Sequence, residues 1–151
     1  MADRTFSRRR FSELACAVGA GLVWARAARA DDYVLVVHPS VGLTEMTVDR
    51  VRSILSLRES QWENGAPVVL VLPPRRSAAI VWMAEGLLRM PESTYRRLVL
   101  GQVFRGAARE PISTESLVDV AKAVASRRGA ISALPGNAVP EDVVVLALRA
   151  S

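Results

Sequence analysis

The first thirty residues decide how much of this chain is left to fold. A basic head reads Ser7-Arg8-Arg9-Arg10-Phe11, a short apolar stretch follows from Leu14 to Ala25, and Ala28 and Ala30 fit an A-x-A cleavage site. The Ser-Arg-Arg-x-Phe order is typical of a twin-arginine export signal, with Arg8 and Arg9 as its paired arginines. The apolar stretch is shorter than the roughly 20 residues of a spanning helix, so we expect membrane contact only during export.

Removal of residues 1–30 changes the charge and the cysteine content of the protein. Six of the 20 basic residues and two of the 15 acidic residues lie there, which leaves 14 basic and 13 acidic residues and a net charge of +1. A near-neutral domain lacks the basic field that nucleic acid requires. The single cysteine, Cys16, is removed as well. We therefore expect a periplasmic domain over residues 31–151, held together by one core without disulfides.

Apolar runs and amphipathic stretches alternate along this domain. Continuous runs of Val, Leu and Ile predict buried strands, and apolar residues three or four apart predict helices with one buried face. The expected strands are 34–38, 68–72, 130–134 and 143–148. The expected helices are 48–55 capped by Thr47, one capped by Ser77 that reaches Leu87, 92–100 and 114–128, with 101–111 irregular. This alternation indicates an α/β fold, a small three-layer arrangement in which helices cover both faces of one sheet.

Five segments, taken in order, resemble a known family. They are Val36-Val37-His38-Pro39-Ser40, Leu43-Thr44 before a helix, residues 62–68 before a strand, Arg76-Ser77 before a helix, and residues 129–132 after a long helix. Their order resembles the phosphate-type substrate-binding proteins of bacterial ABC transporters, which have the type 2 periplasmic binding protein fold. The resemblance covers about residues 34–134 and implies one lobe of a fold that usually has two.

The resemblance implies an oxyanion site at Arg75-Arg76-Ser77-Ala78-Ala79. The family places an arginine before a Ser-Gly-Thr turn at a helix N-terminus; Arg76 and Ser77 match, while the Gly-Thr part is absent. A helix start offers free N–H groups and partial positive charge, so the N–H groups of Ala78 and Ala79, the Ser77 hydroxyl and one arginine would hold phosphate or a related oxyanion. The alternative is that Ser77 only caps the helix and both arginines are solvated.

A second group of candidates follows the first expected strand. Ser40 and Thr44 lie after its carboxyl end, where ligands sit in open α/β sheets, so either hydroxyl would donate to the same oxyanion or simply belong to a turn. His38 is the one histidine, and without cysteine it makes no metal site, so we expect no cofactor. A hydrolase built on His38 and Ser40 would need an orienting acid that the sequence does not identify.

The sequence therefore predicts an exported solute-binding protein rather than an enzyme. Its expected partners are a small oxyanion such as phosphate and an ABC permease or another periplasmic protein, in transport or sensing. A homodimer would supply the second wall of the cleft that one lobe lacks. The alternative is an interaction or sensor module that has lost ligand binding. The missing Gly-Thr favours this alternative, whereas Arg76-Ser77 favours capture; Trp62 and Trp82 are expected to be packing residues.

Overall fold

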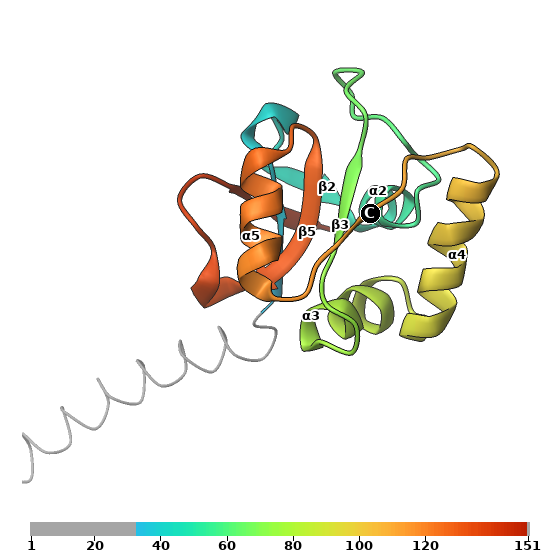
Figure 1. Cartoon of the computed structure of the whole chain (residues 1–151). Coiled ribbons are helices and arrows are strands. Elements are labelled where there is room, and N and C mark those ends of the chain that lie inside the picture. The colour runs from blue at the N-terminus through green and yellow to red at the C-terminus, as the bar shows by residue number, and fades with distance from the viewer. Residues whose placement is uncertain (1–32, 151) are drawn as a thin grey trace, which may run out of the picture. The chain divides into compact units, whose positions relative to one another are not determined.

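The computed structural model describes residues 33–150, which form one six-stranded sheet with helices on both faces (Figure 1). The expected export signal, with Arg8 and Arg9, lies outside the described residues. The strands are β1 (Tyr33–Val37), β2 (Glu45–Thr47), β3 (Val69–Leu72), β4 (Ile112–Ser113), β5 (Ala130–Pro135) and β6 (Val144–Arg149). The helices are α2 (Val48–Leu55), α3 (Ala78–Val81), the π-helical segment η2 (Trp82–Leu87), α4 (Glu92–Phe104) and α5 (Leu117–Ser126), with short 3-10 turns η1 (Pro39–Val41) and η3 (Gly136–Ala138).

The strand order is β2-β6-β1-β5-β3-β4, and β1 runs against the other five strands. It pairs antiparallel with both neighbours, so that Tyr33 lies opposite Pro135 and Val37 opposite Ile131. The pairs β3–β5, β3–β4 and β2–β6 are parallel. The carboxyl end of β1 therefore lies at the end of the sheet where β3 and β5 begin, and the amino end of β1 lies where they finish.

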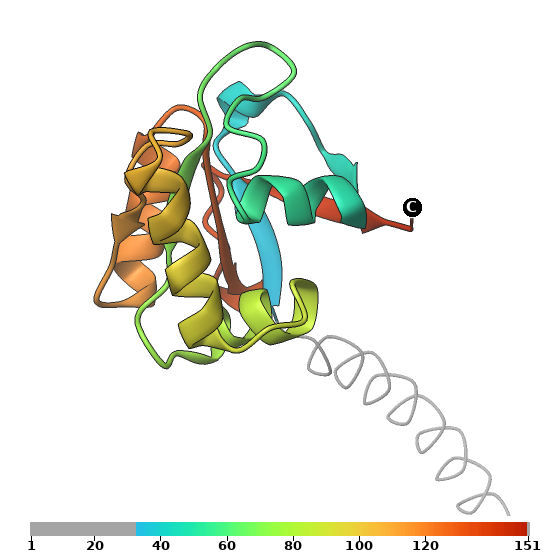
Figure 2. The ribbon, with the colours of Figure 1, turned by 90° about the vertical axis from the view of Figure 1, so that its right-hand side faces the viewer.

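The two faces of the sheet carry separate apolar clusters, which confirms the three-layer prediction. Alternate strand residues point to opposite faces, so Leu35 and Val37 join the cluster under α2, α3, η2 and α4, while Val36 joins the cluster under α5. Figure 2 shows α2, in teal, and α5, in orange, on opposite sides of the strands. Strands buried on both faces are apolar throughout for this reason.

Three serine and threonine caps fix where the helices begin. Thr47, Ser77 and Ser116 each accept, through the side-chain oxygen, the N–H of the residue three positions on, at 3.4, 3.3 and 3.1 Å. A side chain that satisfies one of the free N–H groups at a helix start stabilises the helix by about 1 kcal/mol. The caps at Thr47 and Ser77 confirm the sequence predictions, and the stripe Ile80, Met83, Ala84 and Leu87 is buried as expected.

Two helix boundaries differ from the predictions. Helix α4 extends into the segment expected to be irregular, 101–111, and ends at Phe104. Burial of Tyr95 and Val99 outweighs the roughly 1 kcal/mol cost of Gly101 inside a helix. Helix α5 begins at Leu117 rather than at Thr114. The Thr114 hydroxyl donates to the carbonyl of Leu72 at 2.7 Å, which holds that residue beside β3 and outside the helix.

Two short edge strands were not predicted at all. Strands β2 and β4 contain three and two residues, too few for a periodic pattern to stand out. Each exists because a longer strand beside it offers unpaired backbone groups: β2 pairs with β6, and β4 pairs with β3. Among the described residues, no helix is long and apolar enough to cross a membrane.

The entry into β5 is held by three separate segments that meet at Gly129. Its N–H donates to Ser40 Oγ at 3.1 Å, and its carbonyl accepts from Trp62 Nε1 at 2.9 Å and from the N–H of Val69 at 3.0 Å. Gly129 has a φ of +79°, and a Cβ there would collide with the carbonyl oxygen of Pro67. Only glycine fits a left-handed turn pressed this closely against another backbone.

Gly129→Ala is expected to destabilise the fold by at least about 3 kcal/mol, because it adds a backbone collision to the cost of a positive φ. Gly65→Ala is the matched control: Gly65 has a φ of +82°, but a Cβ there meets nothing within 4 Å. That control should lose only about 1 kcal/mol. Urea unfolding followed by circular dichroism measures both, and equal losses would contradict the role given to the Pro67 contact.

Candidate functional site

The turn that follows β3 carries the arginines and the serine singled out by the sequence. Ser77 caps α3, with its backbone N–H donating to the carbonyl of Pro74 at 3.1 Å. Arg76 has a φ of 63°, a left-handed conformation that a residue with a side chain adopts only at a cost. Strained backbone of this kind persists where the surrounding structure holds it, and it is frequent in binding sites.

The left-handed turn directs the backbone N–H of Arg76 at the carboxylate of Glu92. Both carboxylate oxygens lie 3.2 Å from the Arg76 nitrogen, and the same carboxylate accepts from Arg96 Nε at 3.0 Å. The side chains of Glu92 and Arg96 are 19% and 18% exposed, so this ion pair is largely shielded from water. A carboxylate is an oxyanion, and here one is held by a backbone N–H and a guanidinium at the start of a helix.

An open pocket of about 490 Å³, called here the Arg75–Ser77 pocket, is lined by Arg75, Arg76, Glu92, Ser93 and Arg96. Ser77, Ala78 and Ala79 follow Arg76 in the chain but are not among its lining residues. Three arginines against one carboxylate give the lining a formal charge of +2. Arg75 and Arg76 are exposed, and the structure pairs neither side chain with an acid among the described residues. The pocket therefore retains positive charge beyond what Glu92 neutralises, and it can hold a further small anion.

Sequence reasoning missed Glu92 and Arg96. Their spacing of four residues directly after Pro91 predicts an ion pair on the first turn of a helix, which is a signal that was available. What the spacing does not reveal is that α4 returns to the turn after β3. That contact joins residues 16 positions apart and depends on how α4 packs.

Helix α4 is anchored by Tyr95, which lies between Glu92 and Arg96 in the sequence and is buried in the core. The Tyr95 side chain is fully buried, and its hydroxyl donates to the carbonyl of Leu55 at the end of α2 at 2.8 Å. Burial raises the pKa of the Tyr95 hydroxyl well above its ordinary value, with the nearby Arg96 acting weakly in the other direction. The neutral phenol thus fixes the helix that supplies three of the five residues lining the pocket.

The structure places Ser40 and Thr44 away from this pocket. Ser40 follows the carboxyl end of β1, and because β1 runs against β3, that end is opposite to the end that carries Ser77. Figure 1 shows β1, in blue, leading to the η1 turn at the top and β3 leading down to α3. Thr44 lies at the outer edge of the sheet, where its carbonyl accepts the N–H of Ala147. The two groups of candidates therefore do not form one site.

Ser40 already has structural partners of its own. Its hydroxyl oxygen accepts the Gly129 N–H and lies 2.8 Å from His38 Nδ1, which also accepts the backbone N–H of Ser40 at 3.0 Å. An Nδ1 that accepts an N–H must carry its ring proton on Nε2. Among residues 33–150 no carboxylate bonds to His38, so the pair lacks the acid that orients a catalytic histidine.

The tryptophans pack as predicted. Trp62 is 3% exposed and lies under the loop that precedes β3, where its ring nitrogen donates to Gly129. Trp82 is partly buried against Tyr33, with ring centroids 6.1 Å apart. Within the described part of the chain, no group of three or more histidine, cysteine or acidic side chains gathers to hold a metal ion.

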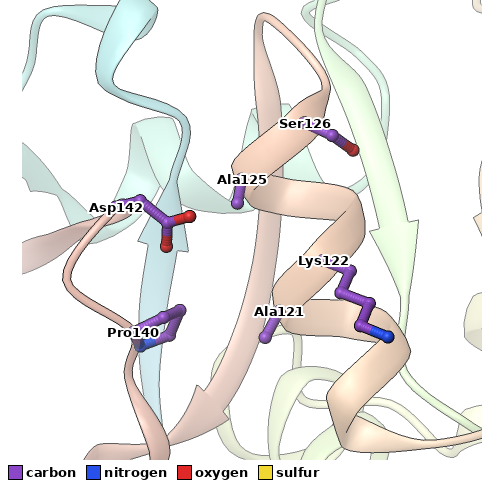
Figure 3. Close-up of a pocket in the computed structure, with 6 residues that line it drawn as sticks. All are labelled: Ala121, Lys122, Ala125, Ser126, Pro140 and Asp142. Carbon is purple, nitrogen blue, oxygen red and sulfur yellow. The ribbon is translucent and has the colours of Figure 1, made fainter.

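A second hollow, of about 430 Å³, lies between α5 and the segment that leads into β6. Ala121 and Ala125 face the segment that carries Pro140 and Asp142, whereas Lys122 and Ser126 point to the other side of the helix (Figure 3). Ala121, Ala125 and Pro140 make part of this lining apolar. No set of donors or acceptors converges on it, so it offers a ligand little beyond shallow apolar contact.

Three solved structures share this fold. A protein from Clostridium perfringens with bound phosphate, described as a phosphate ABC transporter substrate-binding protein, matches with a TM-score of 0.59 at 12% identity, over 78% of this chain and 44% of its own. An ABC-type phosphate transport receptor from Vibrio cholerae matches with a TM-score of 0.58 at 12% identity, over 78% and 46%. PstS from Borrelia burgdorferi matches with a TM-score of 0.54 at 14% identity, over 80% and 48%.

The described residues have the fold of one lobe of a phosphate substrate-binding protein. The chain spans less than half the length of each of these structures. No protein-family model matches the chain, and neither does any curated protein. The resemblance inferred from five sequence segments is thus confirmed at the level of the fold.

Tyr95→Phe tests how α4 is held. It leaves the buried carbonyl of Leu55 without its donor, which should cost about 1–2 kcal/mol at pH 7. Because burial raises the pKa of Tyr95 above its ordinary 10.0, the hydroxyl stabilises the wild-type fold below pH 10, and this contribution falls as pH rises further and the unfolded phenol ionises.

Urea unfolding at pH 7 and above pH 10 measures both effects. The stability gap between the wild type and Tyr95→Phe should narrow at the higher pH. Tyr33→Phe is the control, since Tyr33 is only partly buried and should change little. A gap that stays constant across this range would contradict a buried neutral phenol as the anchor.

Proposed function

We propose that this chain is an exported, one-lobed solute-binding protein whose Arg75–Ser77 pocket captures phosphate or a related oxyanion reversibly. The observation that carries the proposal is that the pocket already holds an anion of its own, the Glu92 carboxylate, on the N–H of Arg76 and the guanidinium of Arg96. Donors arranged to hold one oxyanion suit another of similar size. The fold shared with phosphate-binding proteins supports the same reading.

Each candidate donor, in the pocket lining or directly after it in the chain, has a defined part in the proposed binding. Arg75 and Arg76 supply charge-assisted hydrogen bonds, and the first N–H groups of α3, at Ala78 and Ala79, have no acceptor within the helix. The Ser77 oxygen accepts from the N–H of Ile80, so its own proton remains free to be donated. The proposed complex thus places the oxyanion on the two arginines that line the pocket, with the Ser77 hydroxyl and the helix start as further donors.

The same geometry predicts weak affinity. The pocket is open, and one lobe offers a single wall, so an anion bound there stays in contact with water, which weakens each interaction. Glu92 also competes for the Arg76 N–H. We expect dissociation constants on the order of 1 mM, equivalent to about 4 kcal/mol. A partner that supplies the second wall, an ABC permease, another periplasmic protein or a second copy, would tighten binding.

Isothermal calorimetry with phosphate and sulfate, in a buffer of low ionic strength, tests this proposal. The wild-type chain should give saturable binding. Arg75→Gln combined with Arg76→Gln should weaken it by about tenfold or more, because each charge-assisted hydrogen bond contributes roughly 1.5–3 kcal/mol. Arg127→Gln combined with Arg128→Gln is the matched control. This exposed arginine pair follows the carboxyl end of α5 and does not line the pocket. If both double variants weaken anion binding equally, the effect comes from the overall charge of the protein and not from this pocket. The absence of a saturable heat signal with the folded wild-type chain would overturn the proposal.

Glu92→Gln separates the pocket's own carboxylate from the external anion. The amide has nearly the same shape, but it removes one negative charge and raises the formal charge of the lining to +3. We expect phosphate to bind several times more tightly to this variant than to the wild type, by calorimetry under the same conditions. Weaker binding would mean instead that Glu92 is needed to orient Arg96 and the turn, and would contradict competition.

A further inference from the structure

The outer side of α4 exposes two large apolar side chains that no other element covers. Phe104 is 85% exposed and Leu100 is 49% exposed, and at a spacing of four residues they lie on the same side of the helix. Arg97 is three residues before Leu100 and shares that side. The buried side is formed by Tyr95 and Val99. Tyr95 and Val99 therefore pack α4 against the core, whereas core packing does not explain why a large aromatic residue stands at the exposed position 104.

The surroundings of Phe104 are strongly basic. Among the described residues, Arg97, Arg105 and Arg109 form no ion pair, and the Arg105 guanidinium donates to the side chain of Gln102. Residues 89–109 contain five arginines and one acid, a charge of +4, whereas residues 31–151 as a whole carry +1. The rest of that domain is therefore net negative, by three charges. Arg96 is paired with Glu92, whereas, within residues 33–150, Arg97 on α4 and Arg105 directly after it carry positive charge without an ion pair on the helix that ends at Phe104.

A shallow hollow runs beside the same side chains. It has a volume of about 390 Å³ and is lined by Thr94, Arg97, Leu98, Gly101 and Arg105. Gly101 lacks a side chain at its centre, and a Cβ there would meet no atom closer than 3.9 Å. Helix α4 thus presents an exposed aromatic ring and a shallow hollow, a shape that suits contact with a complementary protein surface.

The charge pattern decides which occupant fits. A two-fold pair of identical chains through this helix would place arginines against arginines, so a symmetric dimer is disfavoured. A helix that lies in a lipid surface has a broad apolar face, whereas α4 exposes only Leu100 and Phe104 between polar residues. A protein surface with acidic groups around an apolar pocket matches both the ring and the arginines.

We propose that the α4 surface formed by Arg97, Leu100, Phe104 and Arg105 docks an acidic protein partner, with Phe104 inserted in an apolar pocket of that partner. The proposal does not depend on oxyanion capture, because none of these four residues lines the Arg75–Ser77 pocket. Aromatic side chains that insert in this way contribute much of the affinity of an interface, and flanking charges set its specificity and association rate.

Photo-crosslinking in the producing cells tests the proposal with the full chain. Phe104 is replaced by p-benzoylphenylalanine, which keeps an aromatic ring, and Val118 on α5, which is 62% exposed, is replaced in the same way as the matched control. We expect position 104, and not 118, to give one protein adduct whose crosslinked segment, sequenced by mass spectrometry, is rich in Asp and Glu. Arg97→Glu combined with Arg105→Glu should lower that yield at least tenfold.

The other outcomes would overturn the proposal in distinguishable ways. An adduct with lipid would assign the surface to the membrane, and an adduct with a second copy of this chain would assign it to self-association. No adduct above the level at position 118, from a chain with an unchanged circular dichroism spectrum, would leave α4 without a partner. Crosslinking that survives the double charge reversal would exclude an acidic partner.

Discussion

The arrangement of this domain depends on the contacts that meet at Gly129. Backbone and side-chain groups from the η1 turn, from the loop before β3 and from β3 itself all bond to this one residue. They place the start of β5 between β1 and β3, where it pairs antiparallel with one and parallel with the other. A side chain at this position would collide with the Pro67 carbonyl, so the close approach is available to glycine alone.

The reversed direction of β1 has a direct consequence for function. In a sheet whose strands all run the same way, residues that follow successive strands gather at one end. Here Ser40 and Ser77 each follow a strand, and yet they lie at opposite ends of the sheet. Ser40 is used for structure, since it bonds to Gly129 and His38. The proposed anion chemistry is left to the end where α3 begins.

The two proposed surfaces share α4 but use different turns of it. Its first turn brings Glu92 and Arg96 to the Arg75–Ser77 pocket, and its last two turns present Leu100 and Phe104 to the outside. The buried Tyr95, bonded to the end of α2, fixes both at once. A protein that docks on α4 would therefore lie near the pocket, and it could supply part of the wall that a single lobe lacks.

Sequence patterns by themselves determined the buried strands, the caps at Thr47 and Ser77, the three layers, the packing of Trp62 and the resemblance to phosphate-type binding proteins. These features depend on hydrophobic periodicity and on interactions between residues a few positions apart, so they can be predicted from the local sequence. Only the tertiary structure decided the direction of β1, the edge strands β2 and β4, and the contact of Glu92 with Arg76. Those features are set by hydrogen bonds and packing between segments far apart in the chain, and many pairings are compatible with the same apolar pattern.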